Sequence, residues 1–198
     1  MMIEAARPTA GLRVQGPGRA VTVVGILVAL WCVGFAAVNV AFELTGRFDD
    51  GDLAEYSSGL TVMNWFVVGL KLLGAAVAVL SIARRPPRQM STDALTVLVW
   101  GAFATLAVYA LGSLVQAAGM VLEVRGSADQ IDVLGVVYLL FFLAAATGYG
   151  VLALSYTGRH GLRKGPVALG VLVAPVLLAG IMLAAPAALT LMGLLPAT

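Results

Sequence analysis

The sequence predicts an all-α fold: a polytopic transmembrane helical bundle of about five helices, with its N-terminus in the cytoplasm. Three features lead to this prediction: the composition, the length of the charge-free runs, and the distribution of basic residues. Of the 198 residues, 61% are apolar and only 11% are charged. A soluble domain carries roughly a quarter charged residues, so much of this chain must consist of stretches that do not meet water.

Five apolar runs account for the low charge, and each is long enough to cross a bilayer. A helix needs about 20 apolar residues to span the ~30 Å hydrocarbon layer. Because backbone groups in lipid must hydrogen bond within their own segment, these runs are predicted to be helices rather than the short alternating strands of a barrel. We place the helices near residues 20–43, 59–83, 94–122, 133–157 and 166–195. They form one transmembrane domain, residues 20–198, after a cytoplasmic tail of residues 1–19.

The first helix is expected to be retained rather than cleaved as part of a signal peptide. Its charge-free run, residues 20–42, is longer than the apolar core of about 7–15 residues that signal peptides carry. Its polar residues Asn39 and Glu43 also suit a helix that stays in the membrane. The second run is interrupted only by Lys71, and the third and fourth contain no charged residue.

The last run contains two prolines, Pro175 and Pro186. Proline removes a backbone hydrogen bond and bends a helix axis. The sequence therefore leaves two forms open for this segment: one kinked helix, or two shorter pieces joined by a re-entrant turn.

Basic residues predict the orientation of the bundle. Nine of the 12 Lys and Arg residues lie in the N-terminal tail and in the loops after the second and fourth helices. These nine are Arg7, Arg13, Arg19, Arg84, Arg85, Arg88, Arg159, Arg163 and Lys164. The other two loops hold only Arg47 and Arg125. By the positive-inside rule the tail is cytoplasmic, and five crossings place the C-terminus outside.

Polar residues recur on single helix faces, and these faces are predicted to converge on one bundle interior. On the second helix, Asn64 and Lys71 share a stripe with small residues, whereas the opposite stripe carries bulky side chains that suit lipid. Counted at 1.5 Å per residue, the polar groups collect in the outer half of the membrane. The predicted interior polar cluster consists of Asn39, Glu43, Asn64, Lys71, Tyr109, Gln116 and Tyr138.

Lys71 is the residue of this cluster with the clearest functional interest. A Lys at the centre of a transmembrane helix costs about 3 kcal/mol on insertion scales, so such residues usually have a role. One interpretation is structural: Lys71 bonds to interior polar side chains and fixes the helix register. Another is binding of a small solute or lipid headgroup. Glu43, reaching inward, is the predicted counter-ion of the Lys71 ammonium. A third is a contact between subunits.

Most other classes of functional site are excluded by the sequence. The single cysteine, Cys32, excludes an intrachain disulfide or a CxxC motif, and the single histidine, His160, excludes a pair of histidines holding a haem. No catalytic or phosphate-binding motif is present, and no basic face suits nucleic acid. The acidic turn at residues 49–52 lacks the length of a calcium loop. We predict no catalytic, cofactor or metal site.

Two segments carry a family resemblance. Residues 67–83 (VVGLKLLGAAVAVLSIA) and 100–122 (WGAFATLAVYALGSLVQAAGMVL) resemble segments of small multi-pass integral membrane proteins of unknown function from high-GC bacteria. An Ala-, Gly- and Val-rich composition and a few polar positions carry the resemblance. It implies a bacterial inner (plasma) membrane protein and transfers no activity and no functional residue.

Three functions remain open from the sequence. The first is a non-enzymatic accessory or scaffolding subunit of a membrane assembly, whose partners are the lipid bilayer and either another membrane protein or further copies of the chain. The second is a binder or transporter of a small solute or lipid headgroup, built around Lys71. The third is a membrane-embedded enzyme that modifies lipids, for which no positioned acid–base pair can be identified.

Overall fold

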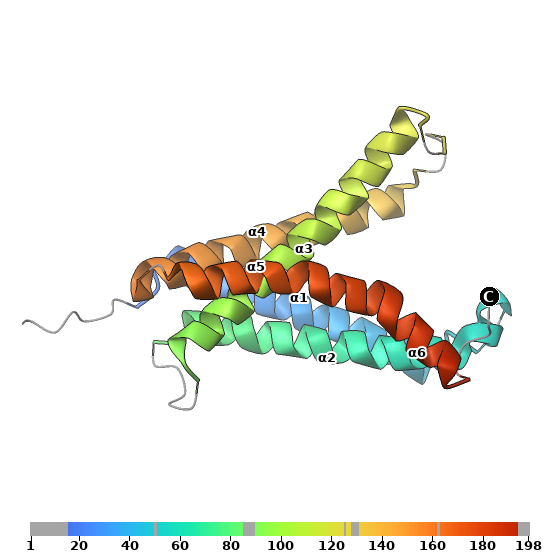
Figure 1. Cartoon of the computed structure of the whole chain (residues 1–198), viewed down its shortest axis with the longest axis horizontal. Coiled ribbons are helices and arrows are strands. Elements are labelled where there is room, and N and C mark those ends of the chain that lie inside the picture. The colour runs from blue at the N-terminus through green and yellow to red at the C-terminus, as the bar shows by residue number, and fades with distance from the viewer. Residues whose placement is uncertain are drawn as a thin grey trace, which may run out of the picture.

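The protein is a bundle of long apolar helices (Figure 1). The computed structural model describes residues 16–49, 51–84, 90–124, 126–127, 131–161 and 163–193, and all regular secondary structure in these residues is helical. Four of the helices are long and apolar enough to cross a membrane. These are α1 (Arg19–Leu44), α2 (Ser57–Ile82), α3 (Thr92–Val121) and α4 (Val133–His160). The predicted all-α bundle is therefore confirmed, and the chain is a membrane protein with several spans.

Several predictions fall on residues outside the described part of the chain. They concern most of the N-terminal tail, the turn between α2 and α3, part of the acidic turn and the end of the last predicted helix. The residues involved are Arg7, Arg13, Asp50, Arg85, Arg88, Arg125 and residues 194–195.

The helix ends follow from local chemistry. Ser91 caps the start of α3 by accepting a hydrogen bond from Ala94 N at 3.1 Å, and Asp132 caps α4 through Gly135 N at 2.5 Å. Such side chains satisfy backbone donors that a helix start leaves unpaired. At the other end of α4, Gly161 takes a φ of +84°, which glycine adopts without strain. A short 3₁₀ helix, η1 (Gly51–Tyr56), leads into α2.

The fifth predicted segment is one kinked helix, and the re-entrant alternative is wrong. It consists of α5 (Lys164–Ala179), a π-helical turn η3 (Gly180–Ala184) and α6 (Ala185–Leu191), which follow one another without a break. The π-helical turn ends two residues before Pro186, whose ring would clash with the carbonyl four residues earlier, within this turn, in a regular α-helix. A wider turn relieves that clash and bends the axis, as Figure 1 shows between α5 and α6.

The helices run back and forth along one axis. The starts of α1, α3 and α5 and the ends of α2 and α4 lie at one end of the molecule, on the left in Figure 1. We call the opposite end the outer end, following the predicted orientation. α1 packs along α2 and contacts α4, while α3 packs against α4 and α5. The outer parts of α3 and α4 extend away from α1 and α2, at the upper right of Figure 1.

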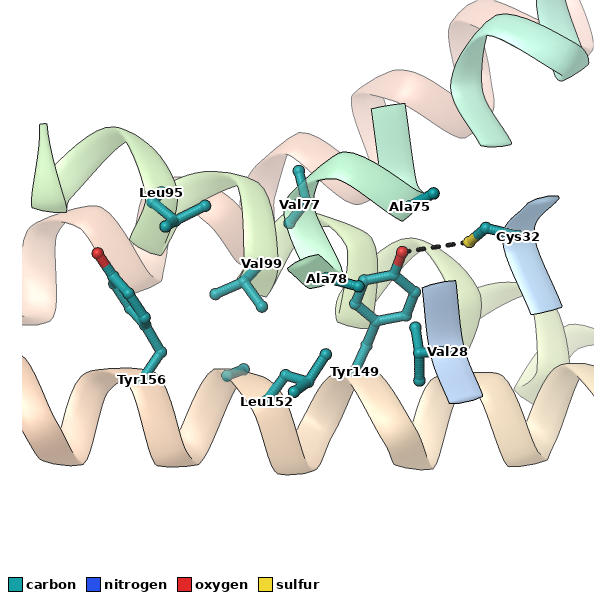
Figure 2. Packing of buried hydrophobic residues seen from close by; sticks show 11 residues of the cluster. Val28, Cys32, Ala75, Val77, Ala78, Leu95, Val99, Tyr149, Leu152 and Tyr156 are labelled. Atoms are coloured by element: carbon teal, nitrogen blue, oxygen red, sulfur yellow. Dashed lines mark hydrogen bonds between the residues drawn. The ribbon is translucent and has the colours of Figure 1, made fainter. Parts of the chain in front are cut away.

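The core lies where α1, α2, α3 and α4 meet (Figure 2). It is built around two fully buried tyrosines of α4, Tyr149 and Tyr156. Glycines allow the helices to approach each other closely, as small residues do in membrane interfaces. A Cβ added at Gly148 would contact the Val28 side chain, and one at Gly170 would lie 2.7 Å from Val97 O of α3.

Candidate functional site

A polar network joins the outer ends of α1 and α2. The Glu43 carboxylate accepts hydrogen bonds from Asn64 Nδ2 at 2.7 Å and from Thr61 Oγ1 at 3.0 Å. Asn64 Nδ2 also donates to the backbone oxygen of Asn39 at 2.8 Å. The Asn39 amide donates to Phe35 O at 2.7 Å, one turn further into the membrane. Three predicted cluster residues, Asn39, Glu43 and Asn64, therefore lie together.

This network has the properties of a structural link between two helices. Asn64 is only 7% exposed, and each Glu43 oxygen accepts one hydrogen bond. Buried polar groups in a membrane need such partners, because lipid offers none. The network fixes the register in which α1 and α2 pack, and its donors are all used within the protein.

Lys71 lies near the middle of the bundle, in a separate group of aromatic side chains. Its ammonium nitrogen is 4.1 Å from the centroid of the Trp31 ring, 4.9 Å from that of Phe142 and 5.1 Å from that of Phe35. Three helices therefore form this group: α1 supplies two rings, α4 one ring and α2 the ammonium. A cation near aromatic faces is attracted by their negative electrostatic potential.

Two further predicted residues extend the aromatic group. The Tyr109 ring of α3 lies 4.7 Å from Phe142, and the Tyr138 ring of α4 lies 6.5 Å from Phe35, measured between centroids. Both tyrosines are partly exposed, at 42% and 46%. They form the rim of a contiguous cluster, which we call the Lys71 aromatic cluster: Trp31, Phe35, Lys71, Tyr109, Tyr138 and Phe142.

The expectation that Glu43 is the counter-ion of Lys71 is wrong. The single salt bridge within the described residues joins Arg163 to Asp93, at 2.9 Å. Lys71 lies against Trp31 and Phe35, and Glu43 is two to three helical turns further along α1, roughly 12–18 Å at 1.5 Å per residue. The α1–α2 register directs the ammonium to these rings and the carboxylate to Asn64 and Thr61, so the two charges do not pair.

Next to Lys71, a hydroxyl and a thiol meet in the core. The Tyr149 hydroxyl lies 3.3 Å from Cys32 Sγ, as Figure 2 shows by a dashed line. Gly74 provides the space, since a Cβ there would lie 2.7 Å from the hydroxyl oxygen. Both side chains are buried, at 1% and 2% exposed. Sulfur is a weak hydrogen-bonding group, so this contact adds packing more than polarity.

Gln116 does not join the interior cluster. The predicted polar face of α3 is exposed, because the outer part of α3 runs away from α1 and α2. Gln116 lies instead in an open groove of about 740 Å³, and its side chain makes no hydrogen bond to another residue of the described part. The groove is lined by Gly112, Val115, Gln116, Gly119, Met120, Val124 and Gly126.

No group of three His, Cys, Asp or Glu side chains that could hold a metal occurs in the searched, described part of the chain.

At the other end of the bundle, Arg159 donates to Ser81 O at 2.6 Å. This bond satisfies a carbonyl at the end of α2 with a positive charge, as helix C-termini favour.

Sequence reasoning missed the residues that surround Lys71. Trp31 and Phe35 of α1 were not among the predicted site residues, nor was Thr61 of the polar network. A signal for the aromatic residues was present, because Trp31 and Phe35 lie one turn apart on α1 and so share a face. Their position against Lys71 depends on the register of two helices, which one helix alone does not specify.

Comparison with protein-family models, with curated proteins and with solved structures finds no match to this chain. The fold and the site define the class of protein. It is a multi-span helical membrane protein with a polar link between α1 and α2, an aromatic cluster around Lys71 and an open groove on α3.

Proposed function

We propose that this chain is a non-enzymatic accessory or scaffolding subunit of a membrane assembly, and that it holds a partner helix in the groove on the outer part of α3. Gln116 carries the proposal. Its amide lies in the open groove on the outer part of α3 and has no hydrogen-bond partner in the described residues. The small residues Gly112 and Gly119 flank it in that groove.

The physical argument rests on how helices associate in lipid. Lipid tails are as apolar as leucine side chains, so helices associate through close packing and interhelical hydrogen bonds instead. Glycines let two backbones approach, and an interhelical side-chain hydrogen bond contributes about 0.6 kcal/mol on average. A partner helix with a polar side chain at the depth of Gln116 would satisfy both conditions. The two Asn amides of α1 and α2 already have partners inside the protein.

The proposed location is the inner (plasma) membrane of a bacterium, with the N-terminus in the cytoplasm. The basic side chains Arg84, Arg159 and Arg163 lie at helix ends on the side where α1 begins. That distribution supports the orientation through the positive-inside rule. The resemblance of residues 67–83 and 100–122 to membrane proteins from high-GC bacteria supports the compartment.

Site-specific photocrosslinking in native membranes tests this function. A photoreactive amino acid is placed at Val115 in the groove, which is 72% exposed, and a matched control at Leu30 on α1, which is 61% exposed. Purification in mild detergent and mass spectrometry then identify the adducts. A protein adduct at a fixed ratio from Val115 but not Leu30, weakened by Gln116→Leu, supports the proposal. Lipid adducts alone at both positions overturn it.

A further inference from the structure

Two neighbouring groups around Lys71 are hydrogen-bond donors that have no acceptor in the described part of the chain. The ammonium makes no hydrogen bond and no salt bridge with any residue in the described ranges. The indole nitrogen of Trp31, whose ring faces that ammonium, is buried and likewise has no partner. This part of the bundle therefore contains a positive charge and an indole N–H that no carboxylate or carbonyl of the described residues accepts a hydrogen bond from. The Glu43 network, by contrast, pairs every donor that it presents.

Aromatic contacts alone do not replace an acceptor. The rings of Trp31, Phe35 and Phe142 stabilise the ammonium through their faces. They leave its N–H groups without an oxygen partner in the described residues. Lys71 is partly buried, and a charged donor in an apolar surrounding is unfavourable unless it is paired. The site is therefore complementary to a group that carries negative charge and oxygen acceptors, and it lacks such a group among its own residues.

We propose that Lys71 binds an oxyanion, a carboxylate or a phosphate, carried by an amphiphile that enters from the bilayer. The Lys71 aromatic cluster would hold the apolar body of this molecule. Its rim tyrosines, Tyr109 and Tyr138, are 42% and 46% exposed, and the neighbours of Lys71 on α2, Leu72 and Leu73, are 51% and 50% exposed. Those surfaces face lipid in a spanning helix, so the approach to Lys71 is through lipid rather than through water.

The anionic head and the apolar body of this ligand are each inferred from a separate observation. The positive charge and free donors select an oxyanion, and a neutral alcohol would not compensate that charge. The contiguous rings select an apolar chain or ring, since they offer a wide apolar surface beside the ammonium. The ammonium and the three rings around it lie on α1, α2 and α4, and Tyr109, the cluster's residue on α3, is not among the residues that line the groove. The site therefore does not rest on the proposed partner helix.

Thermal unfolding of the full-length protein in neutral-detergent micelles tests the site. The probes are oleate, oleyl alcohol, phosphatidylglycerol and phosphatidylcholine. At a concentration about 100-fold above its Kd, an oxyanionic ligand is expected to raise the Tm by about 5–10 °C. Oleate alone identifies a carboxylate ligand, and phosphatidylglycerol alone identifies an anionic phospholipid. Equal effects of oleate and oleyl alcohol, or no effect of any probe, overturn the proposal.

Substitutions then assign the effect to Lys71. Lys71→Met is expected to reduce the effect of the active anion to that of oleyl alcohol, whereas Lys71→Arg, which keeps the charge, retains most of it. Lys164→Met, at the start of α5, is the matched control that removes a positive charge elsewhere and keeps the full shift. An unchanged shift in Lys71→Met overturns the proposal.

A second measurement covers the case in which Lys71→Met does not fold. The wild-type protein is labelled with a diazirine fatty acid and the adducts are mapped by mass spectrometry. Adducts near Trp31, Phe35 or Phe142 that oleate displaces and oleyl alcohol does not displace support the site. Adducts confined to the lipid-facing surface of α5, or equal displacement by both competitors, overturn it.

Discussion

Replacing Asn64 by Ala is expected to destabilise the bundle by about 1–3 kcal/mol. The substitution removes two interhelical hydrogen bonds, one to the Glu43 carboxylate at 2.7 Å and one to Asn39 O at 2.8 Å. It also leaves Glu43, which is half-buried, with Thr61 as its one remaining donor in the described structure. The loss is therefore expected to weaken the packing of α1 against α2 at their outer ends.

The magnitude follows from two scales. A hydrogen bond to a charged group contributes about 1.5–3 kcal/mol in soluble proteins. Interhelical hydrogen bonds in membranes average about 0.6 kcal/mol and reach about 1.7 kcal/mol, because helices that separate in lipid find other partners. Two bonds on the membrane scale give roughly 1–2 kcal/mol, and the carboxylate that loses a donor adds up to about 1 kcal/mol.

The assay is equilibrium unfolding in mixed micelles with increasing SDS, followed by far-UV circular dichroism. The matched control is Thr147→Ala, which removes a hydroxyl bonded only to Leu143 O of its own helix. A double-mutant cycle of Asn64→Ala with Glu43→Ala is expected to give a coupling energy of at least about 0.5 kcal/mol. Strict additivity, with Asn64→Ala no more destabilising than Thr147→Ala, would refute the reasoning.

Three further predictions follow from the contacts between helices, each measured by the same unfolding assay. Gly170→Val should destabilise the protein by about 1–3 kcal/mol or more. A Cβ there would lie 2.7 Å from Val97 O and 3.2 Å from Gly101 N, which are backbone atoms that cannot move aside. The control is Gly69→Val, because no atom lies within 4 Å of a Cβ at that position, and equal losses in the two variants would contradict this explanation. Arg159→Gln should be more destabilising than Arg163→Gln. Arg159 donates a hydrogen bond to Ser81 O at 2.6 Å, whereas the Arg163–Asp93 ion pair is solvent-exposed, and such pairs contribute less than about 1 kcal/mol. The reverse order of stability losses would show that the bond from Arg159 to α2 is unimportant. Tyr149→Phe should change the stability by less than about 1 kcal/mol, because it removes only a weak hydrogen bond to sulfur. Tyr149→Ala also removes the buried ring and should lose about 3–5 kcal/mol of core packing. Similar losses for both variants would show that the hydroxyl matters more than the ring.

The sequence by itself determined that the chain is a membrane bundle, and where its helices lie. Charged side chains are so unfavourable in lipid that they mark the ends of each span. The predicted helix 20–43 therefore matches α1, Arg19–Leu44, and 133–157 matches most of α4, Val133–His160. From helical periodicity, the sequence also predicted that Asn39, Glu43 and Asn64 lie together. They do so because α1 and α2 are antiparallel neighbours joined by a short connection.

The tertiary structure alone decided which helix covers each face. Periodicity tells which residues share a side of a helix, but several neighbours can cover that side equally well. α3 crosses α5 at Gly101 and Gly170, where backbones approach closely, so its outer part departs from the bundle and Gln116 is exposed. The α1–α2 register likewise placed Lys71 against Trp31 instead of Glu43, because the fit of side chains along two whole helices sets that register.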